Sequence, residues 1–174
     1  MYGLALWGGT FQKGLKRIIK LQKRAIRLIT GAHRMDHCEP RQKELKILNI
    51  HDLYRLQVNC LTFDCLFGNP PKEFKNIFIL KRDRPNATTR STSNKPLDID
   101  LVNPINNPGP IVKSTFQIKA LQFWNELPAE LQASRNKDIF KSSLKRFYLA
   151  RYKSRVHCTN VFCKDSNICS FRRM

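Results

Sequence analysis

The chain has 174 residues, of which 41% are hydrophobic and 10% aromatic, and this balance excludes wholesale disorder and permits a real core. Its 32 Lys and Arg against 13 Asp and Glu give a net charge of +19. Such an excess costs folding energy through self-repulsion and therefore indicates a polyanionic partner, with nucleic acid as the first candidate. No apolar run reaches the roughly 18 residues that cross a bilayer, and the apolar start MYGLALWGG lacks the basic region of a signal peptide. We therefore expect an intracellular, nuclear protein with reduced cysteines and no membrane partner.

The block from Phe11 to about Ala32 is predicted to contain one amphipathic helix, which ends with Gly31 as its C′ residue. At about 100° per residue, one arc of about 120° is mainly aliphatic and is expected to pack inward. That arc contains Leu15, Ile18, Ile19, Gln22, Ala25, Ile26 and Ile29. The opposite arc contains the cations Lys13, Lys16, Arg17, Lys20, Lys23, Arg24 and Arg27. No carboxylate precedes Asp36, so nothing within the helix neutralises this face, which is predicted to bind phosphates.

Apolar residues at helical spacing predict four later helices. They run from Pro40 to Leu48, from His51 to Phe67, from Thr115 to Leu127, and from Asn136 or Asp138 to about Tyr152. The last helix has apolar positions at Ile139, Phe140, Leu144, Phe147 and Tyr148. Its cations Lys141, Lys145 and Arg146 are predicted to join the nucleic-acid-binding surface. The aromatics Trp7, Tyr54, Trp124 and Tyr148 are candidates for stacking on a base, although core packing is the favoured interpretation for Trp124.

The region between these helices is rich in Pro, Asn, Thr and Ser from about Lys81 to Pro110, and it is predicted to be a long loop. A short hairpin, with Pro96 to Ile105 against Ile111 to Ile118, is an alternative for part of it. The predicted fold is therefore mainly α, a small helical bundle with one long loop. The expected division is a basic helical module at 1–80, the loop at 81–114, C-terminal helices at 115–152 and a polar tail at 153–174.

Catalytic motifs are weak in this sequence. Asp98 and Asp100, in LDID, would lie on one side of a strand and suit a metal, but no third carboxylate is near and a solvated loop is favoured. No Gly-rich phosphate loop or G-x-S-x-G motif is present. The tail segment HCTNVFCKDSNIC contains four possible metal ligands, His157, Cys158, Cys163 and Cys169. Their spacing fits neither a zinc ribbon nor a zinc knuckle, so a reduced tail is favoured over a zinc site and no cofactor is predicted.

Several phrases occur together in one order along the chain: YGLALWG (Tyr2 to Gly8), LQKRAIRLI (Leu21 to Ile29), LNIHDLYRLQ (Leu48 to Gln57), TTR (Thr88 to Arg90), FWNELP (Phe123 to Pro128) and FKSSLKRFYLARY (Phe140 to Tyr152). With these phrases the chain resembles the C-terminal part of the polyprotein of jockey-like non-LTR (LINE-type) retrotransposons, just after the reverse transcriptase palm. The resemblance spans Tyr2 to about Tyr152.

The resemblance implies a thumb-like and post-thumb fragment of an RNA-directed DNA polymerase, separated from its catalytic palm. No F/Y-x-D-D motif is present, so no catalytic residue is implied and the chain is expected to be inactive as a polymerase alone. The partners it implies are RNA or RNA–DNA hybrid and the missing palm domain. The residues matching the grip on the template–primer backbone are Lys16, Lys20, Lys23, Arg24 and Arg27.

Two alternatives remain open from the sequence. One is a domesticated protein-interaction or assembly module whose basic face meets an acidic protein. The other is a small metal enzyme that uses Asp98 and Asp100. Leu4, Leu6 and Trp7 are expected to be exposed, as a surface that has lost its partner.

Overall fold

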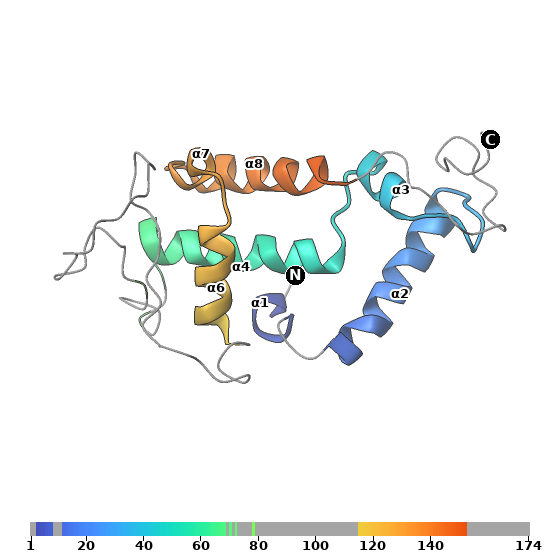
Figure 1. Cartoon of the computed structure of the whole chain (residues 1–174), viewed down its shortest axis with the longest axis horizontal. Coiled ribbons are helices and arrows are strands. Elements are labelled where there is room, and N and C mark those ends of the chain that lie inside the picture. Colours follow the sequence, from blue (N-terminus) through green and yellow to red (C-terminus); the bar gives the residue numbers. More distant parts are fainter. Residues whose placement is uncertain are drawn as a thin grey trace. The chain divides into compact units, whose positions relative to one another are not determined.

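The computed structural model describes residues 3–8, 12–68, 70, 72, 78 and 115–152. Within these residues all regular structure is helical, which confirms the mainly α prediction (Figure 1). The helices are α1 (Leu4–Trp7), α2 (Gln12–Ile29), α3 (Glu39–Glu44), α4 (Ile50–Phe67), α6 (Phe116–Asn125), α7 (Ala129–Gln132) and α8 (Lys137–Ala150). The predicted loop or hairpin at 81–114 and the tail at 153–174 lie outside the described residues, as do Asp98 and Asp100.

Helix α2 ends where a glycine allows the chain to turn. Gly31 has a φ of 61°, in the left-handed region that glycine adopts without steric cost. The Ala32 N–H donates to the Arg27 carbonyl at 2.9 Å, and the Gly31 N–H donates to the Leu28 carbonyl at 3.4 Å. This pair of bonds satisfies the last carbonyls of the helix and confirms Gly31 as the residue after its C-terminus.

Helix α3 stops earlier than the sequence predicted. The expected end was Leu48, but the helix ends at Glu44 because Lys46 adopts a φ of 53°. The Ile47 N–H then donates to the Gln42 carbonyl at 2.9 Å, the same closing bond that Gly31 permits after α2. Leu48 is nevertheless buried, with 4% of its surface exposed, as expected for an inward-facing residue.

Helix α8 begins at the side-chain cap that the sequence offered. The Asn136 Oδ1 accepts the backbone N–H groups of Asp138 and Ile139 at 2.9 and 3.2 Å, so Asn136 rather than Asp138 is the capping residue. Ile139, the first apolar position of this helix, is 60% exposed in its first turn and does not belong to its buried side. Phe140, the next residue, is fully buried instead.

Between the two predicted C-terminal helices lies a further short helix, α7, which the sequence did not predict. Gln132 at its end is buried, and its Nε2 donates to the Trp124 carbonyl at 2.7 Å. A buried amide that closes the C-terminal end of α6 in this way has no hydrophobic signature, which is why periodicity did not reveal it.

The chain forms two compact units, and each joins an early segment to a late one. One unit comprises Met1–Gly9 and Tyr54–Leu144, and the other comprises Thr10–Leu53 and Lys145–Met174. This division differs from the predicted modules, which followed the order of the chain. Helices α4 and α8 each contribute residues to both units.

The first unit is built on an aromatic core. Helix α6 runs across α4 (Figure 1), and Phe67 of α4 meets Trp124 of α6 at a centroid distance of 6.3 Å. Phe140 of α8 stacks on Phe63 at 4.8 Å and lies 5.7 Å from Trp124. Trp124 and Phe140 have no exposed surface, which confirms the core interpretation of Trp124. Large buried rings of this kind dominate the energy of a small core.

The amino-terminal helix α1 packs into the same unit. Leu4 is 2% exposed, so its expected exposure is wrong. A side chain at Gly8 would overlap the ring of Tyr54, and glycine is therefore needed for α1 to lie against that ring. The side chains of Leu6 and Trp7 lie outside the described part of the structure. None of the described helices is both long enough and apolar enough to cross a membrane.

The second unit is held together by polar contacts around the start of α4. The Tyr152 hydroxyl donates to the Asp52 carboxylate at 2.6 Å and accepts the Asn49 N–H at 2.8 Å. The Gln22 side chain of α2 donates to the Leu48 carbonyl at 2.8 Å and accepts the Ile50 N–H at 3.2 Å. These bonds fix α2 to the connection between α3 and α4.

Candidate nucleic-acid interface

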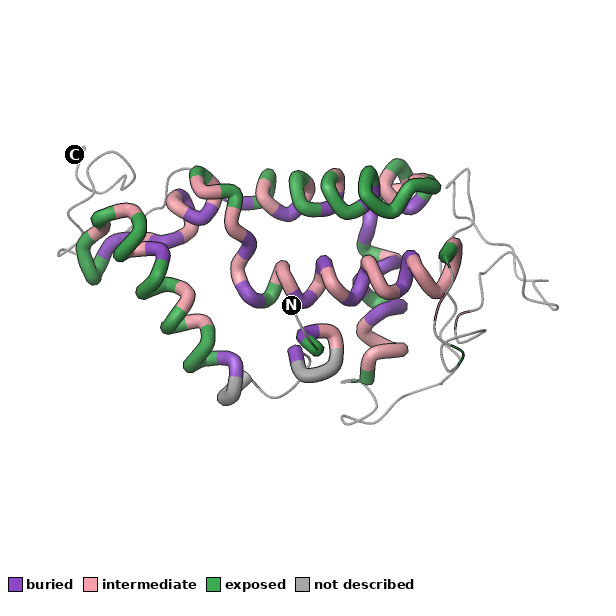
Figure 2. Tube along the Cα trace, turned by 180° about the vertical axis from the view of Figure 1, so that it is seen from behind, coloured by how far each residue is buried: buried purple, intermediate pink, exposed green. Residues whose placement is uncertain are grey.

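Helix α2 has three sides, where the sequence predicted two. Its buried side is narrow: Leu15 and Ile26 are 5% and 2% exposed, and Ile19 and Gln22 beside them are half-buried. The predicted inward packing of Ile18, Ala25 and Ile29 is wrong, because all three are exposed, and Figure 2 shows most of α2 as exposed. The reason is that the neighbouring chain contacts only part of the circumference of α2, as where the Gln22 amide bonds to the Leu48 carbonyl.

The basic side of α2 is exposed as predicted for most of its length. Lys16, Arg17, Lys20, Lys23 and Arg24 all have exposed side chains. Arg27 is half-buried, and the side chain of Lys13 lies outside the described residues. At about 100° per residue these exposed cations occupy an arc of about 120°, adjacent to the buried stripe.

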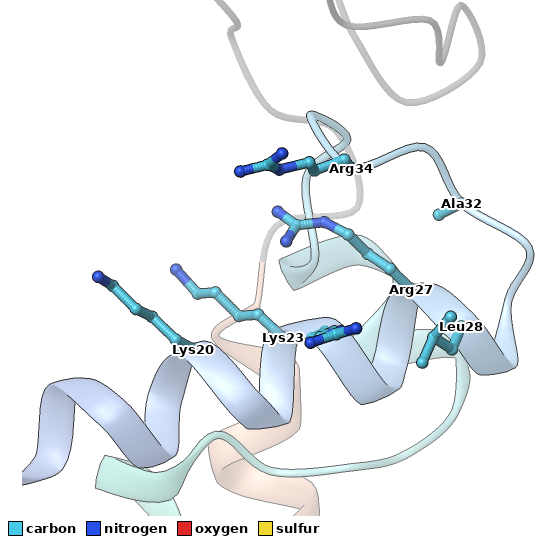
Figure 3. A pocket seen from close by; sticks show the side chains of 7 residues that line it. Lys20, Lys23, Arg27, Leu28, Ala32 and Arg34 are labelled. Carbon is cyan, nitrogen blue, oxygen red and sulfur yellow. The ribbon is translucent and has the colours of Figure 1, made fainter.

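The cations surround a pocket of about 790 Å³, shown in Figure 3. Its lining residues are Lys20, Lys23, Arg24, Arg27, Leu28, Ala32 and Arg34. Five of these seven carry a positive charge and none carries a negative one. In Figure 3 the side chains of Lys20, Lys23, Arg27 and Arg34 extend toward the same side of α2. Because no lining carboxylate balances them, the pocket is a site of positive potential suited to an anion.

The loop after α2 is organised by one buried carboxylate. Asp36 is 4% exposed, its Oδ2 accepts the His33 N–H at 2.8 Å, and the Arg41 guanidinium lies 3.6 Å from the same oxygen. The Asp36 carbonyl in turn accepts two N–H groups of the Arg27 guanidinium, at 3.1 and 2.9 Å. This fork fixes the direction of Arg27 before any ligand binds, which lowers the entropy cost of binding.

Arg34 also lines the pocket, although it was not among the basic residues predicted from the sequence to bind phosphates. The turn at Gly31 reverses the chain, and the bond between the His33 N–H and Asp36 fixes the loop that carries Arg34. A glycine directly after the helix, followed within three residues by Arg34, was the available signal. Periodicity could not reveal the pairing because it describes positions on one helix only.

The predicted basic positions of α8 are not among the residues that line this pocket. Lys141, Lys145 and Arg146 are exposed, but none of them lines it. Lys141 belongs to the first unit, while Lys145 and Arg146 belong to the second. The aromatics proposed for base stacking are buried instead: Tyr54, Trp124 and Tyr148 are 7%, 0% and 2% exposed. They stabilise the two cores, and so cannot stack on a base.

Metal and thiol chemistry finds little support in the described part of the chain. There, no group of three or more His, Cys, Asp or Glu residues is placed to hold a metal ion. The candidate ligands His157, Cys158, Cys163 and Cys169 lie outside the described residues. Burial raises the pKa of the Cys60 and Cys65 thiols to about 11, so both are protonated and unreactive near neutral pH.

Comparison with known proteins gives no match to a protein-family model, a curated protein or a solved structure.

Proposed function

We propose that this chain is a non-catalytic, post-palm segment of a jockey-like non-LTR retrotransposon reverse transcriptase, and that it binds the template–primer backbone through α2. The quoted sequence phrases support the family assignment. The observation that carries the binding proposal is the pocket of five cations without a carboxylate. RNA–DNA hybrid is the proposed ligand, since the parent enzyme copies RNA into DNA.

The spacing of the pocket cations suits a polyanion rather than a single small anion. Lys20 and Arg27 are seven residues apart on α2, which corresponds to about 10 Å along the helix axis. This distance is close to the rise of about three nucleotides along one strand. Successive phosphates of one strand can therefore meet successive cations, with Arg34 adding a contact from the loop.

Binding of this kind is sequence-independent and depends on salt. If the five cations neutralise about five phosphates of a duplex, the logarithm of the binding constant falls with the logarithm of salt concentration with a slope of about −4.5. The contacts are with the backbone and carry no information about base sequence. We therefore expect equal affinity for hybrids of different sequence.

The experiment measures fluorescence anisotropy of a labelled RNA–DNA hybrid across a range of salt concentrations. K20E/K23E removes two pocket cations, and we expect it to weaken binding and to reduce the slope by about 1.8. K72E/K119E is the matched control, with the same change of charge at two lysines of the other compact unit. Polyglutamate serves as an acidic competitor with no sugar–phosphate backbone.

Two outcomes would contradict the proposal. Equal losses in K20E/K23E and K72E/K119E would mean that overall charge, and not the pocket, binds the hybrid. Displacement of the hybrid by polyglutamate at equal charge concentration would favour an acidic protein as the natural ligand.

A further inference from the structure

The third side of α2 is apolar and exposed. Leu21, Leu28 and Ile29 are 65%, 74% and 67% exposed, and Ile18 is 36% exposed. With Leu15 at zero and about 100° per residue, these side chains and Ala25 fall between about 220° and 320°. We call these five residues the apolar sector of α2. Single exposed aliphatic residues are ordinary, but five neighbours on one side of a helix mark an interaction surface.

The spacing within the apolar sector is that of a helix-pairing seam. Ile18, Leu21, Ala25 and Leu28 follow one another at intervals of three, four and three residues, which are the a and d positions of a heptad repeat. Such a stripe packs along the stripe of a second helix. The small Ala25 between two leucines leaves room for a larger side chain of the partner.

The charges that border the sector restrict the chemistry of the partner. Arg17 and Arg24, both exposed, lie along one edge at about 200° and 180°. No residue of α2 is acidic. A partner helix therefore meets two arginines beside its apolar stripe, and carboxylates along that edge would pair with both.

A second copy of the chain does not satisfy this requirement. Pairing two α2 helices would bring Arg17 and Arg24 against cations or uncharged residues, because α2 offers no carboxylate. Each chain also carries a net charge of +19, which opposes self-association. A bilayer is also a poor fit, because the other edge of the sector adjoins Gln22, whose amide is hydrogen-bonded to the segment around Leu48. Because the segment around Leu48 lies beside the apolar sector, the sector is accessible only as one side of a helix. A bilayer would need a flat apolar face.

We infer that the apolar sector of α2 is a docking surface for an acidic amphipathic helix of another protein, with Leu21 and Leu28 as apolar anchors and Arg17 and Arg24 as the charged edge. This surface shares Leu28 and Arg24 with the pocket proposed to bind phosphates, whereas Arg17 and the other four residues of the apolar sector do not line that pocket. The inference does not depend on the nucleic-acid proposal, since most of its apolar contacts lie outside the pocket.

The test uses the full chain and a labelled three-heptad peptide with Leu at its a and d positions and Glu along one edge. A matched peptide carries Lys in place of every Glu. In the protein, L21Q/I29Q replaces two residues that are more than half exposed and do not line the pocket, so the fold and hybrid binding should persist. Anisotropy titrations give the affinity of each pair, and circular dichroism confirms that the variant is folded.

We expect the Glu peptide to bind the wild-type chain at least about tenfold more tightly than it binds L21Q/I29Q, because each buried aliphatic side chain contributes on that scale. The Lys peptide should bind at least about tenfold more weakly than the Glu peptide. Hybrid affinity should be the same for wild type and L21Q/I29Q, which separates failure of this inference from failure of the nucleic-acid proposal.

Three results would overturn the inference. Equal affinity of the Glu peptide for wild type and L21Q/I29Q would show that charge alone attracts it. If the wild-type chain cosedimented with phosphatidylcholine–phosphatidylserine vesicles, lost this in L21Q/I29Q and did not bind the peptide, the apolar sector would be a membrane-binding surface. If light scattering showed that the wild-type chain is a dimer and the L21Q/I29Q variant a monomer, the apolar sector would bind a second copy of the chain.

Discussion

Replacing Asp36 with alanine tests whether the geometry of the loop, and not only its charge, makes the pocket. Overall electrostatics predicts that D36A binds a polyanion more tightly, because it removes a negative charge beside Arg27 and Arg41. The structure predicts the opposite. The Asp36 carboxylate fixes the His33 backbone, and this loop carries Arg34 and presents the carbonyl that orients Arg27.

The expected loss of stability in D36A follows from the burial of the ion pair between Asp36 and Arg41, which the substitution breaks. The side chains of Asp36 and Arg41 are 5% and 16% exposed, so removing the Asp36 carboxylate takes one ion-pair contact from a largely buried guanidinium. Breaking a buried pair costs about 3–5 kcal/mol, and we expect about 3 kcal/mol because Arg41 retains some contact with water. If the loop opens, two of the five pocket cations are displaced, and the salt slope falls by about 1.8.

Urea unfolding measures the stability term, and anisotropy of the labelled hybrid measures the affinity and its salt slope. Glu44→Ala is the matched control, because it removes an exposed carboxylate at the end of α3 in the same unit. We expect E44A to bind the hybrid slightly more tightly and D36A to bind it more weakly. If D36A gained affinity as E44A does, the pocket would not depend on the loop and the reasoning would be refuted.

Two predictions concern the two cores. Tyr152→Phe removes the hydroxyl that joins Asp52 to the Asn49 N–H, and we expect a loss of about 1–3 kcal/mol in urea unfolding because both half-buried partners lose a bond. Unchanged stability would mean that water replaces the hydroxyl. Burial raises the pKa of Cys60 from 9.0 to about 11, so the unfolded state releases this proton first and stability falls between pH 9 and 11, by at most about 1.4 kcal/mol per pH unit. The measurement compares the free energy of unfolding at pH 8 and pH 10, and the Cys60→Ala variant should lose less stability between the two than wild type. An equal loss in both proteins would mean that other groups cause the decline.

Local sequence signals predicted the helices well wherever capping or termination chemistry was explicit. Gly31 marked the end of α2, and Asn136 was one of the two residues named as the start of α8. Local sequence signals did not predict a helix end where a residue adopts a backbone conformation that its type rarely takes. Lys46 takes the left-handed conformation that usually belongs to glycine, and it ends α3 early.

The candidate site divides in the same way. The cations of α2 were visible in the sequence because seven of them occupy one arc and no carboxylate is near. Arg34 and the supporting role of Asp36 were not visible, because the Gly31 turn and a buried hydrogen bond bring them to the pocket. The prediction that Tyr54 and Tyr148 stack on a base was wrong, because aromatic residues in a small protein are needed for its core.

Residue type and a period of 3.6 are enough to show that α2 is amphipathic, basic and free of acidic residues. They could not determine which aliphatic residues are covered. Leu15 and Leu21 are chemically identical and both lie on α2, yet one is 5% exposed and the other 65%. The difference depends on which side of α2 the rest of the chain covers, and the Gln22 amide bonds to Leu48 and Ile50 hold one covering segment against the helix. Tertiary packing thus separated the aliphatic residues of α2 into a core stripe and an exposed surface.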